Sequence, residues 1–208
     1  MKITLLNRSD ARGVIYVAGH DAEDYSSCRT NIALIKVEDW NAQLSPWPAP
    51  ACFKGSEDFA GGADDFLNEI HKSIPAFEEE NGFNDPVRGI MGYSLAGLFA
   101  VYALLNSDLF TMAASVSGSL WFENWIEYAK ANADKTNGKS VYLSVGSREK
   151  KTRNIRLADV EKNMYLTEEI FSRAGAKVFS ELNDGGHFVN DNARMIKAIR
   201  HFENADNY

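Results

Sequence analysis

The amino-acid sequence predicts an α/β fold in which helices flank a central, mostly parallel β-sheet. Short β-rich apolar segments alternate along the chain with longer segments of helical pattern, as they do in parallel sheets with crossover helices. Several of the short segments are almost continuously apolar, which is typical of strands buried on both faces. The chain has 208 residues, of which 45% are hydrophobic, and this suits one domain over residues 1–208 with a single core.

The elements follow one another without an internal repeat, low-complexity segment or interdomain linker. Strands are expected over residues 2–7, 13–18, 32–37, 87–92, 112–117, 140–146 and 176–182. Helices are expected over residues 62–80, 95–106, 121–132, 159–174 and 190–204. Residues 66–72 show the helical pattern within the first helix, and residues 98–105 give the second helix its apolar face.

The segment Gly-Tyr-Ser-Leu-Ala-Gly at residues 92–97 joins a predicted strand to a predicted helix. A sharp turn of this kind strains the backbone of its serine, so the residues two positions away on either side must be small, as Gly92 and Ala96 are. The turn also places Ser94 at a helix N-terminus, where N–H groups favour negative charge on a substrate oxygen. These features predict the nucleophile elbow of the α/β-hydrolase fold; an incidental serine in a strand–turn–helix connection is the alternative.

A serine needs a positioned base to act as a nucleophile, and in this fold the chain order is serine, acid, histidine. His187 follows the last predicted strand, and the two glycines before it let the imidazole turn back over the sheet. His201 lies inside the terminal helix and is interpreted as a surface or packing residue. His187 is therefore predicted to be the base, with an ordinary surface-loop histidine as the alternative.

The acid should lie just past the strand between the serine strand and the histidine strand. Glu149 is the first acid of that loop, where it would accept the N–H of His187 and hold the ring in the required tautomer. Asp159, at the start of the following helix, is the second candidate. A further alternative is that Glu149 only pairs with Lys150 or Arg153.

Two backbone N–H groups are expected to form an oxyanion hole. One belongs to Leu95, the residue after the nucleophile, and the other to His20, in the loop after the second strand.

Aromatic side chains flank the predicted mouth of the site, and apolar walls are typical of small-molecule pockets. The candidate substrate-binding residues are Trp47, Trp121 and Tyr93. Trp40, Phe122 and Trp125 flank the same mouth, although each aromatic taken alone fits a place in the core equally well. No insertion is long enough to form a lid domain.

The net charge of −7 argues against nucleic acid as a partner. The densest basic stretch, at residues 148–153, is short and contains an acid, so a local role is expected for it. The N-terminus lacks the apolar core of a signal peptide and no segment reaches membrane-spanning length, so a cytoplasmic location without membrane contact is expected. Cys28 and Cys52 suggest neither a disulfide framework nor a metal site.

Four segments resemble the esterase family of α/β-hydrolases that includes esterase D and the siderophore (enterochelin-type) esterases. They are residues 92–98, 117–121, 145–154 and 185–187, and the resemblance extends from about residue 13 to the C-terminus. It implies hydrolysis of carboxylic esters without metal or organic cofactor. By position, Ser94 matches the nucleophile, His187 the base, and Gly19-His20 the oxyanion loop.

The chain also departs from this family. It is short, Ala96 replaces the second glycine of the elbow, and Ser147 and Arg148 stand where the family often has an acid. Some siderophore-type relatives work with a serine–histidine pair, so a dyad is a further alternative to the triad with Glu149.

The predicted function is a serine carboxylesterase that hydrolyses a small-molecule ester through an acyl-enzyme on Ser94. An acyltransferase with the same residues and a non-catalytic binding module with the same fold are the alternatives. The acyl and alcohol parts of the substrate are left open, as is the formation of a homodimer.

Overall fold

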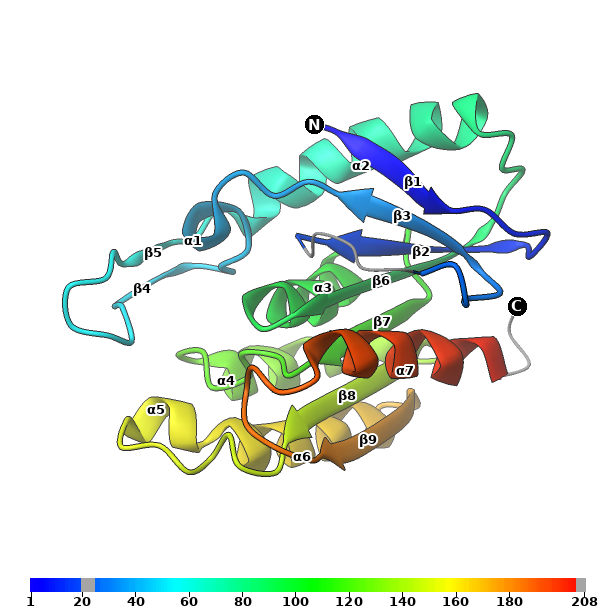
Figure 1. Ribbon diagram of the computed structural model, residues 1–208. Coiled ribbons are helices and arrows are strands. Elements are labelled where there is room, and N and C mark those ends of the chain that lie inside the picture. The colour runs from blue at the N-terminus through cyan, green and yellow to red at the C-terminus, as the bar shows by residue number, and fades with distance from the viewer. Residues whose placement is uncertain (20–24, 205–208) are drawn as a thin grey trace.

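The structure, a computed structural model, describes residues 1–19 and 25–204 and contains a seven-stranded sheet in the order β1-β3-β2-β6-β7-β8-β9 (Figure 1). The strands are β1 (Ile3–Asn7), β2 (Gly13–Ala18), β3 (Asn31–Ile35), β6 (Val87–Tyr93), β7 (Met112–Val116), β8 (Ser140–Gly146) and β9 (Lys177–Asn183). β1 pairs with β3 in the antiparallel sense, and the other neighbouring strands of this sheet pair in parallel. The predicted, mostly parallel sheet is confirmed.

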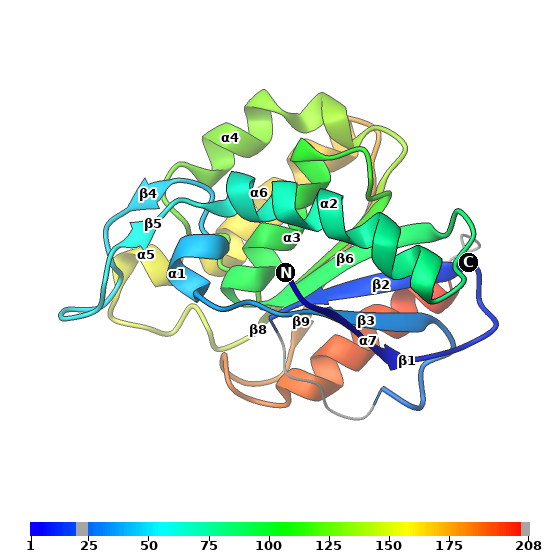
Figure 2. The same cartoon turned by 90° about the horizontal axis from the view of Figure 1, so that it is seen from above.

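Helices cover both faces of the sheet. They are α1 (Trp40–Gln43), α2 (Ala63–Glu80), α3 (Leu95–Asn106), α4 (Trp125–Ala131), α5 (Ile155–Ala158), α6 (Val160–Arg173) and α7 (Asp191–Asn204), with a 3-10 turn at Ala133–Thr136. Figure 2 shows α7 on one side of the sheet and α2, α3, α4 and α6 on the other. Among the described residues, no helix has both the length and the apolar character needed to cross a membrane.

Side chains of the strands alternate between two apolar layers, as the two-residue period of a strand requires. On β2, Val14 and Tyr16 belong to the layer shared with α2 and α3, whereas Ile15 and Val17 belong to the layer shared with α7. All six residues of β2 are buried, which explains its continuous apolar sequence.

All the predicted strands and long helices are present. β2, β8 and α3 have the predicted bounds, and the other elements differ at one or both ends. The helix expected over residues 121–132 begins only at Trp125, because Asn124 has a φ of 62°, which a right-handed helix excludes. The short helices α1 and α5 and a hairpin of β4 (Pro48–Ala49) and β5 (Phe59–Ala60) were not predicted. Elements of two to four residues are too short to produce a readable periodicity.

The carboxyl ends of the parallel strands meet at one edge of the sheet, which is where open α/β sheets bind ligands. α1, the β4–β5 hairpin and α5 extend beyond this edge, on the left of Figure 1. The loops that follow β6, β8 and β9 therefore lie close together, although long stretches of chain separate them in sequence.

The connection from β6 to α3 is a tight turn at Ser94, whose φ of 58° and ψ of −123° lie outside the regions that L-residues favour. The turn brings Gly92 against the first turn of α3. A Cβ atom on Gly92 would lie only 2.5 Å from the carbonyl oxygen of Ala96 and 2.6 Å from its Cβ. The close approach explains why small residues are needed on both sides of the serine.

We therefore expect Gly92→Ala to lower the free energy of unfolding by about 1–3 kcal/mol, because the added methyl must push the strand and helix apart. Urea denaturation followed by circular dichroism measures the change. Gly186→Ala is the matched control, since a Cβ there meets no heavy atom within 4 Å. Equal stability of the two variants would contradict the steric explanation.

Candidate active site

Backbone hydrogen bonds hold Ser94 in its strained conformation. Its N–H donates to the carbonyl of Val116 at the end of β7 (3.0 Å), and its carbonyl accepts from the N–H of Ser119 (3.0 Å). Strain of this kind persists where the surrounding structure over-determines the backbone. The hydroxyl of Ser94 is thereby presented at the carboxyl edge of the sheet.

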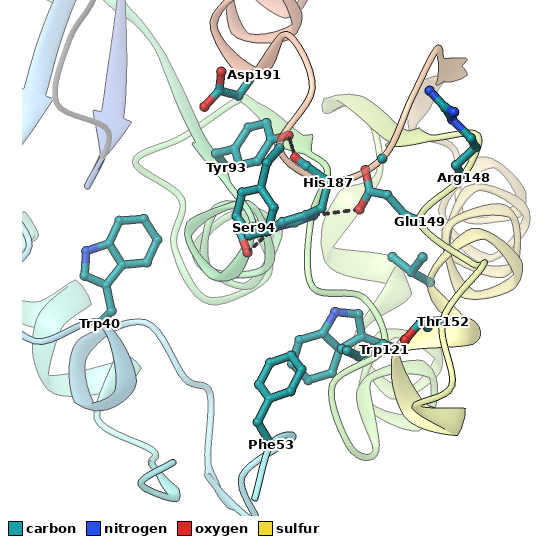
Figure 3. Close-up of a pocket in the computed structure, with 14 residues that line it drawn as sticks. Trp40, Phe53, Tyr93, Ser94, Trp121, Arg148, Glu149, Thr152, His187 and Asp191 are labelled. Atoms are coloured by element: carbon teal, nitrogen blue, oxygen red, sulfur yellow. Dashed lines mark hydrogen bonds and ion pairs between the residues drawn. The ribbon is translucent and has the colours of Figure 1, made fainter. Parts of the chain in front are cut away.

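Figure 3 shows His187 between Ser94 and Glu149. Nε2 of His187 lies 3.0 Å from Oγ of Ser94, and Nδ1 lies 2.7 Å from Oε2 of Glu149. Because an ionised carboxylate only accepts, Nδ1 carries the proton toward Glu149 and leaves Nε2 to accept the serine proton. The structure thus brings the three predicted side chains into the serine–histidine–acid arrangement of a triad.

The loop that carries His187 is fixed from two sides. Gly185 has a φ of 97°, which a glycine adopts without strain, and a Cβ there would lie 2.8 Å from Val189. The hydroxyl of Tyr93 donates to the carbonyl of His187. Tyr93 therefore connects the end of β6 to the histidine loop in addition to lining the cavity described below.

Glu149 lies in the turn that follows β8, and its side chain is only 6% exposed. Its second oxygen, Oε1, accepts from the N–H of Gly146 (2.6 Å) and from Nη1 of Arg194 (3.1 Å). Burial raises the pKa of Glu149, but the hydrogen bond and charge of His187 and the Gly146 N–H outweigh it and hold the pKa below its ordinary value. The carboxylate is therefore ionised at neutral pH.

Arg194, on α7, was not predicted as a site residue. Its side chain is 3% exposed, and Nη1 donates to Oγ of Ser117 (2.8 Å) as well as to Glu149. Nη2 donates to the carbonyls of Asp184 (2.9 Å) and Gly186 (3.0 Å). One buried guanidinium thus binds the acid, the loop after β7 and the histidine loop.

Of the two predicted oxyanion-hole donors, only Leu95 lies among the described residues. Leu95 is the first residue of α3, and N–H groups in the first turn of a helix have no partner within the helix. The second predicted donor, His20, lies outside the described residues. The N–H of the preceding Gly19 donates to the carbonyl of Ile35 (3.0 Å).

A cavity of about 620 Å³ opens beside Ser94 and His187. Its apolar walls are Trp40, Phe53, Trp121, Leu157, Val160 and Phe188, and its polar lining includes Arg148, Thr152 and Asp191. Two of the wall residues stand at the open rim, where Phe188 is 88% exposed and Phe53 63% exposed. Phe53 lies in the loop of the β4–β5 hairpin, which was not predicted from the sequence.

The predicted aromatic residues divide into two groups. Tyr93 and Trp121 line the cavity, and so does Trp40. Trp47 was expected there as well, but it packs behind the wall against Phe122 and Tyr128, with ring centroids 5.8 and 5.1 Å apart. Its indole N–H donates to the carbonyl of Glu123 (2.9 Å), which fixes the ring away from the cavity.

Phe122 and Trp125 are core residues, 2% and 0% exposed. Asp159, the second candidate for the acid, lies 3.9 Å from Lys162 in an exposed ion pair and does not line the cavity. His201 stacks on Phe179 with a centroid distance of 4.5 Å, as expected for a packing residue. Within the described residues, no group of three or more His, Cys, Asp or Glu side chains could hold a metal ion.

The pairing of Glu149 with Arg194 predicts non-additive stability. Arg194→Met leaves a buried carboxylate without its cation and should cost about 3–5 kcal/mol. Glu149→Gln removes that charge, so the double variant should lose clearly less than the sum of the two single variants. Urea unfolding at pH 7 measures all three, with Arg200→Met, an exposed position on the same helix, as the control. Strictly additive losses would contradict a direct coupling.

Comparison with known proteins places the chain among esterases. Residues 18–200 match the family described as "Putative esterase". Over 157 residues the chain is 31% identical to the uncharacterized protein YbbA of Bacillus subtilis (strain 168), an alignment that covers 72% of this chain and 61% of that protein. The aligned region therefore spans about three-fifths of the length of this relative.

Solved structures share the fold at low identity. An IroE-like serine hydrolase from Shewanella oneidensis superposes with a TM-score of 0.73 at 15% identity, covering 96% of this chain and 73% of that chain. The siderophore hydrolase EstA from Aspergillus nidulans gives a TM-score of 0.67 at 20% identity, covering 94% and 84%. The enterobactin esterase FES from Shigella flexneri gives 0.70 at 17%, covering 95% and 53%. The predicted α/β-hydrolase fold is confirmed, and the match over residues 18–200 shows that the chain belongs to this esterase family.

Proposed function

We propose that this protein is a serine carboxylesterase that hydrolyses a small-molecule carboxylic ester through an acyl-enzyme on Ser94. The observation that carries the proposal is the continuous chain of contacts from Ser94 to His187 to Glu149 beside an open cavity. Membership of the esterase family supports the same chemistry. So do the names of structural neighbours, which include siderophore and enterobactin hydrolases.

The geometry suits a two-step reaction. Nε2 of His187 takes the proton as Oγ of Ser94 attacks the ester carbonyl, and Glu149 stabilises the imidazolium that forms. The N–H of Leu95 then faces the negative charge that develops on the carbonyl oxygen, with His20 as the expected second donor. His187 returns the proton to the leaving alcohol, and a water molecule activated by the same imidazole releases the acid.

Because Glu149 is buried, its carboxylate stabilises the imidazolium of His187 more strongly than an exposed carboxylate would. Glu149 is held by Gly146 and Arg194 on one oxygen, so only the other oxygen is available to His187. The imidazole is therefore fixed in one tautomer and one orientation. These contacts support a triad over a serine–histidine dyad.

The apolar walls fit an aromatic or aliphatic part of the substrate beside the scissile bond. Neither nucleic acid nor a membrane enters this proposal. A cytoplasmic location is proposed as well, with both cysteines, Cys28 and Cys52, present as thiols.

The test is hydrolysis of 4-nitrophenyl esters over a range of acyl lengths. Ser94→Ala and His187→Ala should each lower kcat on the order of 10⁴-fold or more, because each removes part of one catalytic unit. Glu149→Gln should also lower kcat, by a smaller factor, because the serine–histidine pair remains in place. Ser172→Ala and His201→Ala, which lie outside the cavity, are the matched controls.

Wild-type turnover that survives Ser94→Ala would overturn the mechanism. Equal rates for Glu149→Gln and wild type would remove the carboxylate from it and leave the dyad. Absence of turnover on the whole ester panel would contradict the general esterase activity proposed here.

A further inference from the structure

The segment that follows β8, residues 148–161, carries more positive than negative charge. Residues 148–161 include five basic side chains, Arg148, Lys150, Lys151, Arg153 and Arg156. Their three acidic side chains all have partners: Glu149 binds His187 and Arg194, Asp159 lies near Lys162, and Glu161 pairs with Lys150 at 2.7 Å. Within the described part of the chain, no carboxylate lies within ion-pair distance of the other four cations.

One of these cations, Arg148, lines the cavity of the catalytic site, and two others are sequence neighbours of a second lining residue. Arg148 and Thr152 both line it, and Thr152 stands between Lys151 and Arg153, which are exposed. Figure 3 shows Arg148 and Thr152 on the Glu149 side of the site, with Asp191 beyond Tyr93 on the other side. The cationic side and the acidic side of the rim are therefore distinct.

Arg156 adds a half-buried positive charge behind the cavity wall. Its guanidinium carbon lies 5.8 Å from the ring centroid of Trp121, and Nη1 donates to the carbonyl of Pro50 (2.8 Å). Nε and Nη2 are buried without a hydrogen-bond partner among the described residues. The guanidinium therefore adds to the positive potential at the Trp121 wall.

The sign of this cluster is opposite to that of the whole protein. The chain carries a net charge of −7, which on average repels anions. The exposed cations without carboxylate partners make the potential beside the cavity positive, so an anionic group is attracted to the opening of the cavity. The apolar walls of the same cavity would hold the uncharged part of such a ligand.

We propose that the substrate is an ester that carries an anionic group, with the apolar part against Trp121 and Phe53 and the anion beside Arg148, Lys151 and Arg153. The proposal rests on the esterase function proposed above and narrows its substrate class. Only Glu149 of residues 148–153 belongs to the triad, so the triad does not explain the four basic side chains of this stretch. The proposal gives them a role in binding the anion.

The first experiment compares esters that differ only in charge. The substrates are mono(4-nitrophenyl) adipate and its neutral terminal amide, together with 3-carboxy-4-nitrophenyl butyrate and its carbamoyl analogue. Wild type should prefer at least one anionic ester over its amide in kcat/KM by about tenfold, the size expected of a few exposed charges. The preference should shrink as NaCl is raised, because salt screens exposed charges.

The variant that tests the site is Arg148→Gln/Lys151→Gln/Arg153→Gln. Its ratio of anionic to neutral kcat/KM should fall toward one. The matched control, Lys72→Gln/Lys130→Gln/Arg200→Gln, removes the same charge from exposed positions that do not line the cavity and should keep the wild-type ratio. No preference in wild type, or the same ratio in both triple variants, overturns the proposal.

A binding measurement separates failure of this inference from failure of the esterase function. Trp40 and Trp121 line the cavity, so tryptophan fluorescence of Ser94→Ala can report binding without turnover. 4-Phenylbutyrate should bind about tenfold more tightly than 4-phenylbutanamide, and the additional triple substitution should abolish the difference. Equal binding of acid and amide overturns the anion site even when neutral esters are hydrolysed. Tighter binding of the acid supports the site even when no ester is turned over.

Discussion

The arrangement of the site depends on one buried cation. Arg194 projects from α7 and donates to Glu149, to Ser117 after β7, and to the carbonyls of Asp184 and Gly186. These partners come from separate loops at the carboxyl edge of the sheet, and their relative positions fix the distance between Glu149 and His187. A guanidinium suits this task because its rigid fork presents several donors at once. Removing it would leave a buried carboxylate unpaired, which is far more costly than losing an exposed ion pair.

A second constraint acts at Ser94, the proposed nucleophile. Ser94 is strained, and the strain is sustained by the bond from its N–H to Val116 and by the close packing of Gly92 on Ala96. β6, β7 and α3 must therefore be well packed before the hydroxyl reaches its position. The geometry of the site therefore depends on the stability of the fold. The apolar layer beneath α3 contributes to both.

The sequence allowed prediction of the features that depend on local order. Ser94 lies in a turn whose small residues are adjacent in sequence, and His187 and Glu149 follow from the order of strands and loops in the fold. Arg194 could not be found in this way, because an arginine within a helix is ordinarily exposed and only the tertiary contacts of α7 bury it. Trp47 was misplaced for a related reason: sequence gives the loop that carries an aromatic ring but not the direction in which the ring points.

The unpaired positive charge at the rim of the cavity also depends on tertiary contacts that the sequence does not reveal. The basic stretch after β8 is short and contains one acid, so the sequence alone predicted only a local role for it. The structure directs Glu149 inward to His187 and pairs Lys150 with Glu161, so the remaining cations are left without carboxylate partners beside the cavity. Folding thus leaves most of the positive charge of this segment without carboxylate partners among the described residues, on a protein whose net charge is −7.

Covalent labelling tests the central role of Ser94 most directly. The wild-type protein and His187→Ala should be treated with an alkyl fluorophosphonate, weighed intact by mass spectrometry and mapped by peptide analysis. We expect one adduct per wild-type chain, on the peptide that contains Ser94, and labelling of His187→Ala slower by orders of magnitude, because the hydroxyl has lost its base. An adduct on another serine, or equal labelling rates in the two proteins, would contradict the nucleophile and base assigned here.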